Sequence, residues 1–181
     1  MTSHNISEIL KRKDISRKMT RSLEQTREKN CEHTFDICSG VDVPTTDIEK
    51  GSEYHVDIRK KCPIGSKSLG NFHTHVHLSE SNNDAIPSSG DMMETIERDL
   101  NFVCVSGDNH RGPVTRCFHH NDIKTEIGTM LNKKKLEPNE ENVRKSARSI
   151  TKRMMRDKDY LKNMSQEINY VDGKPKSNIQ R

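Results

Sequence analysis

Three histidines stand at alternate positions in the stretch NFHTHVHL, at residues 73, 75 and 77. Residues two apart on a β-strand point to the same side of the sheet, so the imidazoles of His73 and His75 can meet at one metal ion, and His77 would share that side. A Ser-x-x-Asp sequence follows and places Asp91 in the first turn of an expected helix. Two neutral imidazoles and a carboxylate make a three-ligand zinc site with a fourth position open to water. The pattern therefore predicts a catalytic rather than a structural zinc site.

A strand and a helix must position these groups. The stretch NFHTHVHL predicts the strand, and in SSGDMMETIERDL either Ser88 or Ser89 is in position to cap the helix. Alternation of apolar and polar residues in EHTFDICSG and in YHVDI predicts two earlier strands, and NFVCVSG with PVTRCFHH predicts a hairpin. We therefore expect residues 29–122 to form a compact α/β domain.

The two ends of the chain have the composition of charged helices. Residues 1–28 place apolar side chains at roughly helical intervals among charges, which predicts an amphipathic helical segment. In residues 123–181 apolar side chains recur at spacings of four and three from Val143 to Ile168, and VDGKPKSNIQR predicts a disordered tail. Eight basic and two acidic residues between Arg144 and Lys162 give this segment a charge of +6. Such a basic helix could bind a protein partner, and nucleic acid is a less favoured alternative.

Composition limits the size and the location of the protein. With 181 residues, of which 29% are hydrophobic and 4% aromatic, one small core is more plausible than two. The net charge of +4 is too mild to imply nucleic acid without clustering. No apolar run is long enough to span a membrane, so we expect a cytoplasmic protein that does not contact membranes.

The five cysteines are an odd number and include no Cys-x-x-Cys pair. In a reducing cytoplasm such residues are usually buried free thiols, which is the expectation here. A zinc site that combines Cys62 or Cys117 with His119 or His120 is an alternative, although its spacing matches no standard zinc finger.

The sequence GNFHTH followed by PSSGD resembles the motif of the JAMM, or MPN-plus, zinc metalloproteases, which share the JAB domain. That motif consists of a glutamate, then His-x-His with Ser or Thr between, then Ser-x-x-Asp. The resemblance implies one zinc ion per chain, bound by His73, His75 and Asp91. It also implies that Ser88 positions water and stabilises the oxyanion. The upstream glutamate would be the general base.

Four glutamates could supply that base: Glu28, Glu32, Glu49 and Glu53. The family's glutamate opens a strand, with apolar residues three and five positions on and a glycine soon after. Phe35, Ile37 and Gly40 fit this description for Glu32, which is therefore the predicted base. The order of elements is also similar to that of the family, which implies a single JAB/MPN-like domain over residues 29–122, a mixed β-sheet with flanking helices. Residues 1–28 and 123–181 would be N- and C-terminal helical extensions.

The chain departs from the family motif in two places. Twelve residues separate His75 from Ser88, more than is usual in the family, and Val76 replaces the usual proline. The loop can be an insertion, because loops lengthen at little energetic cost. Alternatively, the ligand pair is His75 and His77. The residues just before His73 match those that lead into the family's first ligand, which favours His73 and His75.

The predicted function is zinc-dependent hydrolysis. Zinc acidifies water and polarises a carbonyl, Glu32 accepts the proton of the water, and an amide bond is cleaved. The resemblance implies an isopeptidase that removes ubiquitin or a ubiquitin-like modifier from a modified protein. Alternatives are a non-enzymatic MPN-like scaffold and a nucleic-acid-associated relative of bacterial JAB-like proteins connected with DNA repair. Metal-dependent phosphoesterase or amidohydrolase barrels also use His-x-His but need about 200 residues or more and further ligands.

Overall fold

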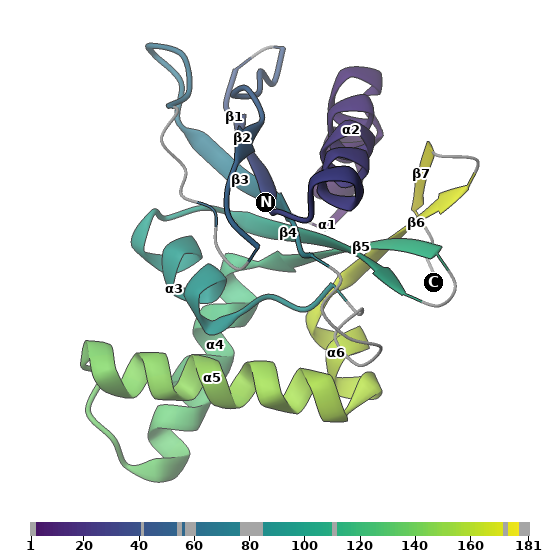
Figure 1. Ribbon diagram of the computed structural model, residues 1–181. Coiled ribbons are helices and arrows are strands. Elements are labelled where there is room, and N and C mark those ends of the chain that lie inside the picture. Colours follow the sequence, from purple (N-terminus) through teal and green to yellow (C-terminus); the bar gives the residue numbers. More distant parts are fainter. Residues whose placement is uncertain are drawn as a thin grey trace.

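The computed structural model describes residues 3–40, 42–53, 56, 61–76, 85–109, 112–171 and 174–177. In this part of the chain a seven-stranded mixed sheet, ordered β2-β1-β3-β4-β5-β6-β7, lies between two groups of helices (Figure 1), which confirms the α/β class. The strands are β1 (His33–Cys38), β2 (Glu49–Lys50), β3 (Ser68–Thr74), β4 (Phe102–Asn109), β5 (Gly112–His119), β6 (Gln166–Val171) and β7 (Lys174–Ser177). The helices are α1 (Ser3–Lys11), α2 (Lys13–Lys29), α3 (Ser89–Glu97), α4 (His120–Lys134), α5 (Glu140–Arg156) and α6 (Lys158–Met164).

The connection between β3 and β4 determines where a site can form. These two strands are parallel, whereas the other neighbouring pairs in the described sheet are antiparallel. A parallel pair needs a crossover that carries the chain back to the start of the second strand, and α3 provides it. The N-terminus of α3 therefore lies near the end of β3, where the histidines are.

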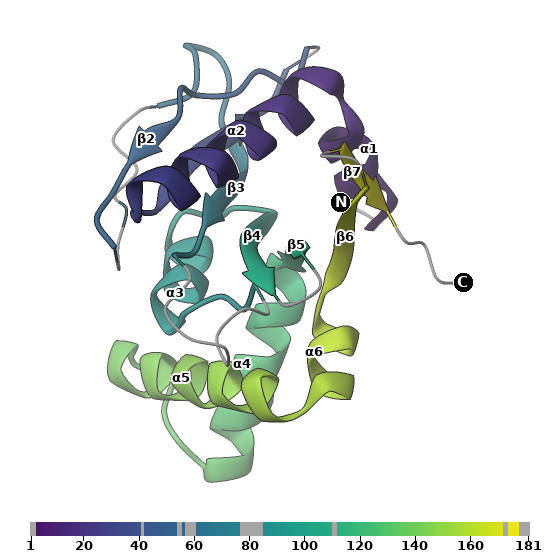
Figure 2. The ribbon, with the colours of Figure 1, turned by 45° about the vertical axis from the view of Figure 1, so that its right-hand side comes forward.

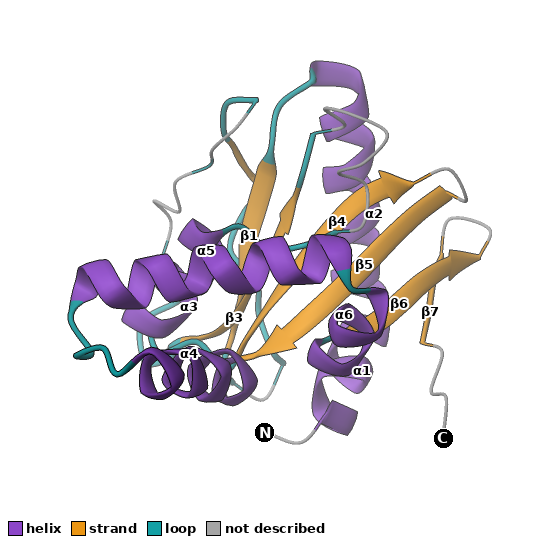
Figure 3. Cartoon of the chain, turned by 90° about the horizontal axis from the view of Figure 1, so that it is seen from below, coloured by secondary structure: helices purple, strands orange, loops and turns teal. Residues whose placement is uncertain are grey.

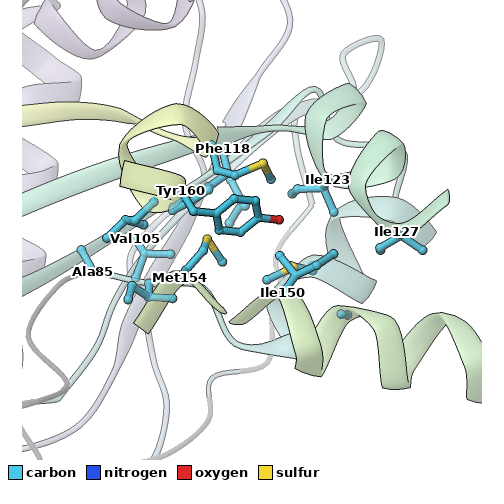
Figure 4. Packing of buried hydrophobic residues seen from close by; sticks show 14 of the residues in the cluster. Ala85, Val105, Phe118, Ile123, Ile127, Ile150, Met154 and Tyr160 are labelled. Atoms are coloured by element: carbon cyan, nitrogen blue, oxygen red, sulfur yellow. The ribbon is translucent and has the colours of Figure 1, made fainter. Parts of the chain in front are cut away.

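Each face of the sheet has its own hydrophobic core. Helices α1 and α2 cover one face, and α3 to α6 cover the other (Figures 2 and 3). On the first face α1 and α2 pack against aromatic residues of the strands, including Phe35, Phe72 and Phe102. On the second face Val105 and Phe118 of the sheet meet α4, α5 and α6, with Tyr160 among them (Figure 4). The sheet thus has a hydrophobic core on each of its two sides.

Most of the predicted elements around the histidines are present. EHTFDICSG forms β1, NFVCVSG and PVTRCFHH form the β4–β5 hairpin, and the predicted helix forms α3 with Ser88 as its N-cap. Apart from Val56, the predicted strand YHVDI lies outside the described residues, and so does His77. None of the described helices is long and apolar enough to cross a membrane.

The C-terminal region differs from the prediction. The helical pattern was expected to continue to Ile168, and a disordered tail was expected from residue 171. Instead β6 pairs with β5 in the register Thr115↔Ile168, and β7 pairs with β6. The prediction was wrong because β5 would otherwise be a long unpaired edge, and strand pairing outweighs the local helical spacing.

The prediction of free thiols was also wrong for four of the five cysteines. Cys38 is bonded to Cys62, and Cys104 is bonded to Cys117, which leaves the buried Cys31 as the free thiol. Cys104 and Cys117 are direct partners across β4 and β5. The alternative zinc site is excluded as well, because Cys62 and Cys117 have no thiolate to offer.

Gly70 allows β3 and β4 to pack closely. A Cβ at this position would overlap the ring of Phe102, its partner on β4. We predict that Gly70→Ala lowers the free energy of unfolding by about 1–3 kcal/mol, because the ring cannot move within a filled core. Urea denaturation would measure the change.

Gly128→Ala is the matched control for this prediction. Gly128 lies inside α4, and a Cβ there would meet nothing within 4 Å. Alanine should stabilise this half-buried helical position by up to about 1 kcal/mol, because it lowers the conformational entropy lost on folding. An equal loss of stability in both variants would contradict the close approach at Gly70.

Candidate metal centre

β3 presents a polar row to the side of the sheet that faces α3. Phe72 points to the α1 and α2 side, so Asn71 and His73 point to the opposite one. Across the antiparallel pair, Asp36 lies opposite Asn71 and Thr34 lies opposite His73. All four side chains of this row are buried, which is unusual for polar groups unless they bond to one another.

The end of β3 is held from the other face by α2. The Oγ1 atom of Thr26 on α2 lies 2.5 Å from Oγ1 of Thr74 and 3.0 Å from Nδ1 of His33. The N–H of His33 donates to the same Thr74 hydroxyl at 2.9 Å. Beyond β3, His75 N–H donates to Ser106 O at 2.8 Å and so continues the parallel pairing with β4. The backbone of both predicted histidine ligands is therefore fixed.

The N-terminus of α3 supplies the carboxylate. Ser88 and Asp91 form a capping box in which Asp91 N–H donates to Ser88 Oγ at 3.1 Å and Ser88 N–H donates to Asp91 Oδ2 at 2.6 Å. This arrangement satisfies backbone donors that a helix start leaves unpaired. It also holds the Asp91 carboxylate in one orientation, toward the histidines.

Three donor atoms converge at this point. His73 Nε2 lies 3.3 Å from His75 Nε2 and 3.4 Å from Asp91 Oδ2, and His75 Nε2 lies 3.6 Å from the same Oδ2. Ligands bonded to one ion at about 2.0–2.1 Å in tetrahedral geometry are about 3.3–3.4 Å apart. The cluster can therefore hold a metal ion, and it consists of the three groups that the sequence predicts as ligands.

The site is closed on one side and open on the other. The side chain of His73 is 5% exposed, whereas His75 and Asp91 are 23% and 21% exposed. An ion bound there would have protein behind it and an accessible position in front. This distribution is typical of catalytic metal sites, since structural sites surround the ion completely.

The charges of the cluster shift the pKa values of its members. Burial alone would lower the pKa of His73, but the carboxylate of Asp91, assisted by Glu32 and Glu94, raises it. Burial alone would raise the pKa of Asp91, but His73 and His75 hold it well below the usual range. Without metal, the site therefore favours an ionised carboxylate beside a protonated imidazole, and a metal cation would replace the proton.

The predicted catalytic residues lie in the same cleft as the ligands. A cavity of about 320 Å³ is lined by the three ligands, Glu32 and Ser88, together with other residues of α3 and the sheet. Glu32 directly precedes β1; its N–H donates to Ser52 O at 2.7 Å, and its carbonyl oxygen accepts the N–H of Gly51 at 2.8 Å. Its carboxylate is close enough to contribute to the raised pKa of His73.

The other glutamates considered as the base are placed elsewhere. Glu28 is on α2, Glu49 is on β2 and Glu53 follows β2, and none of them is among the residues that line this cavity. Glu94 and Glu97 of α3 do line it, but they lie downstream of the histidines. Glu32 is therefore the upstream glutamate that the structure brings to the ligands.

Sequence reasoning missed the groups behind the ligands. Asn71 Oδ1 lies 3.0 Å from His73 Nδ1, and Asn71 in turn contacts the buried Asp36. The signal for Asn71 was available, because a residue two positions before His73 on a strand shares its side of the sheet. For Asp36 it was not, because the register between β1 and β3 cannot be read from the sequence.

The chain shows no significant match to any model of a known protein family, to any curated protein or to any solved structure.

We predict that the wild-type chain binds one divalent transition metal ion, with Zn²⁺ as the probe. His75→Ala and Asp91→Asn should each weaken binding by more than about 100-fold, because each removes one of three ligands. Asparagine at position 91 keeps a side-chain oxygen for the helix cap, so the fold should persist. Competition with a chromophoric chelator would measure the affinities.

The same titrations should depend on pH with a definite sign. Because the pKa of His73 is raised above its usual 6.5, protons compete with the metal at higher pH than for an ordinary histidine. Affinity should therefore fall as the pH decreases through that raised pKa. His120→Ala is the control and should bind zinc like the wild type, since His120 is not among the residues that line the cavity. Equal affinities for wild type and both ligand variants would refute the cluster as a metal site.

Proposed function

We propose that this chain is a zinc-dependent hydrolase that cleaves a peptide or isopeptide bond. The observation that carries the proposal is the convergence of three donor atoms, 3.3 to 3.6 Å apart, in a cleft that Glu32 and Ser88 also line. A general base and a hydroxyl donor beside an open metal position are the groups that metal-assisted hydrolysis needs.

Zinc is the ion that suits these ligands best. Two imidazole nitrogens and one carboxylate oxygen, with the spacing of a tetrahedral site, are a common ligand set of catalytic zinc. When bound, zinc supplies a Lewis acid that polarises a substrate carbonyl and lowers the pKa of water. The residues of the chain itself perform the remaining tasks.

Glu32 would move the proton. Its carboxylate accepts a proton from the attacking water while the water oxygen bonds to the carbonyl carbon. It then donates this proton to the leaving amine as the C–N bond breaks. One water molecule is consumed, and a carboxylate and an amine are released.

Ser88 would stabilise the developing oxyanion. Its Oγ already accepts the Asp91 N–H, and this bond leaves the hydroxyl proton available to the cleft. A hydroxyl aimed at the carbonyl oxygen favours the transition state over the bound substrate. The capping role also explains why Ser88 is held beside the ligands.

The substrate follows from the resemblance of GNFHTH and PSSGD to the JAMM motif. We propose a ubiquitin-like modifier attached to a protein, cleaved at the bond between its C-terminus and a lysine. The basic helix α5 could bind part of a protein partner.

The cytoplasmic location also stays a prediction. The two disulfides are more usual in oxidising compartments than in the cytoplasm.

The two alternatives have weaker support. A scaffold without activity does not need three convergent ligands with an open side. A nucleic-acid partner would need free positive charge on α5, but Arg144, Lys145 and Arg153 each pair with an acidic residue four positions away. These pairs reduce the field that phosphate would experience.

We predict that the zinc-loaded wild-type chain cleaves an isopeptide-linked conjugate of ubiquitin or of a ubiquitin-like protein, and that Glu32→Gln lowers the rate by about 10²–10⁴-fold. Glutamine has nearly the same shape but cannot accept the proton. The measurement is the release of the modifier from each of a panel of conjugates, monitored by gel electrophoresis and mass spectrometry.

Metal content separates a catalytic effect from damage to the site. The Glu32→Gln variant should retain one zinc per chain, because Glu32 is not a ligand. Glu49→Gln is the matched control and should cleave at the wild-type rate. If the zinc-loaded wild type cleaved no conjugate or peptide, the scaffold alternative would replace the proposed function.

A further inference from the structure

The side-chain amide of Asn71 has a defined orientation. Its Nδ2 lies 2.8 Å from Thr34 Oγ1, 3.1 Å from Asp36 Oδ1 and 3.3 Å from Phe35 O, which are all acceptors in this arrangement. The Thr34 hydroxyl donates its own proton to Phe72 O at 3.0 Å, so it accepts from Asn71. A flipped amide would place an oxygen against these acceptors. The network therefore assigns the amide nitrogen to this side.

The orientation of Asn71 fixes the proton on His73. Asn71 Oδ1 can only accept, and it lies 3.0 Å from His73 Nδ1. His73 Nδ1 must therefore carry a proton and donate it. In the neutral ring, the lone pair is then on Nε2, the atom that lies 3.3 and 3.4 Å from the other two ligand atoms.

The buried carboxylate of Asp36 holds Asn71 in place. Asp36 is 1% exposed, and its Oδ1 accepts from Asn71 while its Oδ2 accepts from Ser68 Oγ at 2.6 Å and from the guanidinium of Arg98. A buried charge is stable only when it is paired and hydrogen-bonded, and both oxygens of Asp36 have such partners. Asp36 cannot turn without losing Arg98, and Asn71 cannot turn without losing Asp36.

We infer that Asn71, with Asp36 behind it, is a positioning residue that selects Nε2 of His73 as the metal-binding atom and orients its ring. The inference rests on the proposed function only in that a metal ion occupies the cluster. A carbonyl or carboxylate behind a ligating histidine fixes the tautomer and the ring, and its loss typically costs about 10–100-fold in metal affinity. Here the supporting oxygen belongs to the side-chain amide of Asn71, and the carboxylate of Asp36 holds that amide in place.

The test combines zinc affinity with the tautomer of His73. In Asn71→Leu, a side chain of similar shape replaces the amide, but Nδ1 of His73 loses its acceptor. We expect zinc to bind about 10–100-fold more weakly than in the wild type. We also expect the ¹⁵N NMR signals of His73, measured without metal well above its pKa and assigned by comparison with His73→Ala, to change. The wild-type spectrum should show protonated Nδ1, and the variant should show a mixture of tautomers.

Asn71→Asp keeps the inference testable if leucine prevents folding. The introduced carboxyl would lie about 3 Å from Asp36, and two carboxyl groups so close share a proton. It would therefore donate to Asp36 as the amide does and still offer an oxygen to His73. Zinc affinity should lie much closer to that of the wild type than in Asn71→Leu.

Ser68→Ala is the matched control. It removes another hydrogen bond from Asp36, on the oxygen that does not face Asn71. Zinc affinity should change by less than about threefold, and the tautomer of His73 should stay the same. If the substitutions acted by loosening the polar row in general, zinc binding would weaken in Ser68→Ala as well as in Asn71→Leu.

The possible failures can be distinguished. If the wild type binds zinc and Asn71→Leu binds it equally well with the same tautomer, the inference is wrong and the proposed function stands. If the wild type binds no zinc, both are wrong. An Asn71→Asp variant that loses as much affinity as Asn71→Leu would also overturn the role of the acceptor oxygen.

Discussion

The ion pair between Asp36 and Arg98 is the interaction on which the arrangement of the site depends. Asp36 is buried on β1 among residues of β3, and Arg98 reaches it from the C-terminal end of α3. Removing one partner of a buried pair typically costs about 3–5 kcal/mol, because the remaining charge cannot be solvated. Arg98 follows Asp91 by seven residues, or two helical turns, so both side chains face the sheet. The pair thus holds the C-terminal end of α3 to the sheet, while the capping box at the other end orients the Asp91 carboxylate.

The site and the fold use the same residues. Asp91 is at once the N3 residue of a capping box and the acidic member of the metal cluster, and Ser88 is both the cap and the proposed oxyanion donor. The parallel pairing of β3 with β4 brings the start of α3 to the end of β3. A chain that folds in this way must bring the carboxylate to the histidines, and no movement of the described elements is needed to assemble the cluster.

Local patterns in the sequence were sufficient to predict which three side chains come together at the candidate metal site. Two patterns depend on only a few neighbouring residues: the spacing of two between His73 and His75, and the capping signal at Ser88 and Asp91. In the structure the two histidines meet at one point and the capping box is formed. What could not be predicted depends on pairing between distant segments. The register of the sheet determines the Cys104–Cys117 disulfide, strand β6 in place of a helix end, and the contact of Asp36 with Asn71. Single-sequence periodicity does not contain that register.

The measurement that tests this account most directly is an anomalous difference map at the zinc absorption edge, from crystals of the protein prepared with one equivalent of zinc. The account predicts one peak within about 2.0–2.2 Å of His73 Nε2, His75 Nε2 and Asp91 Oδ2. Asn71 should remain bonded to Nδ1 of His73. A map without a peak at this position, or a peak bound by His77 in place of His73, would contradict the central claim that these three side chains form the metal centre.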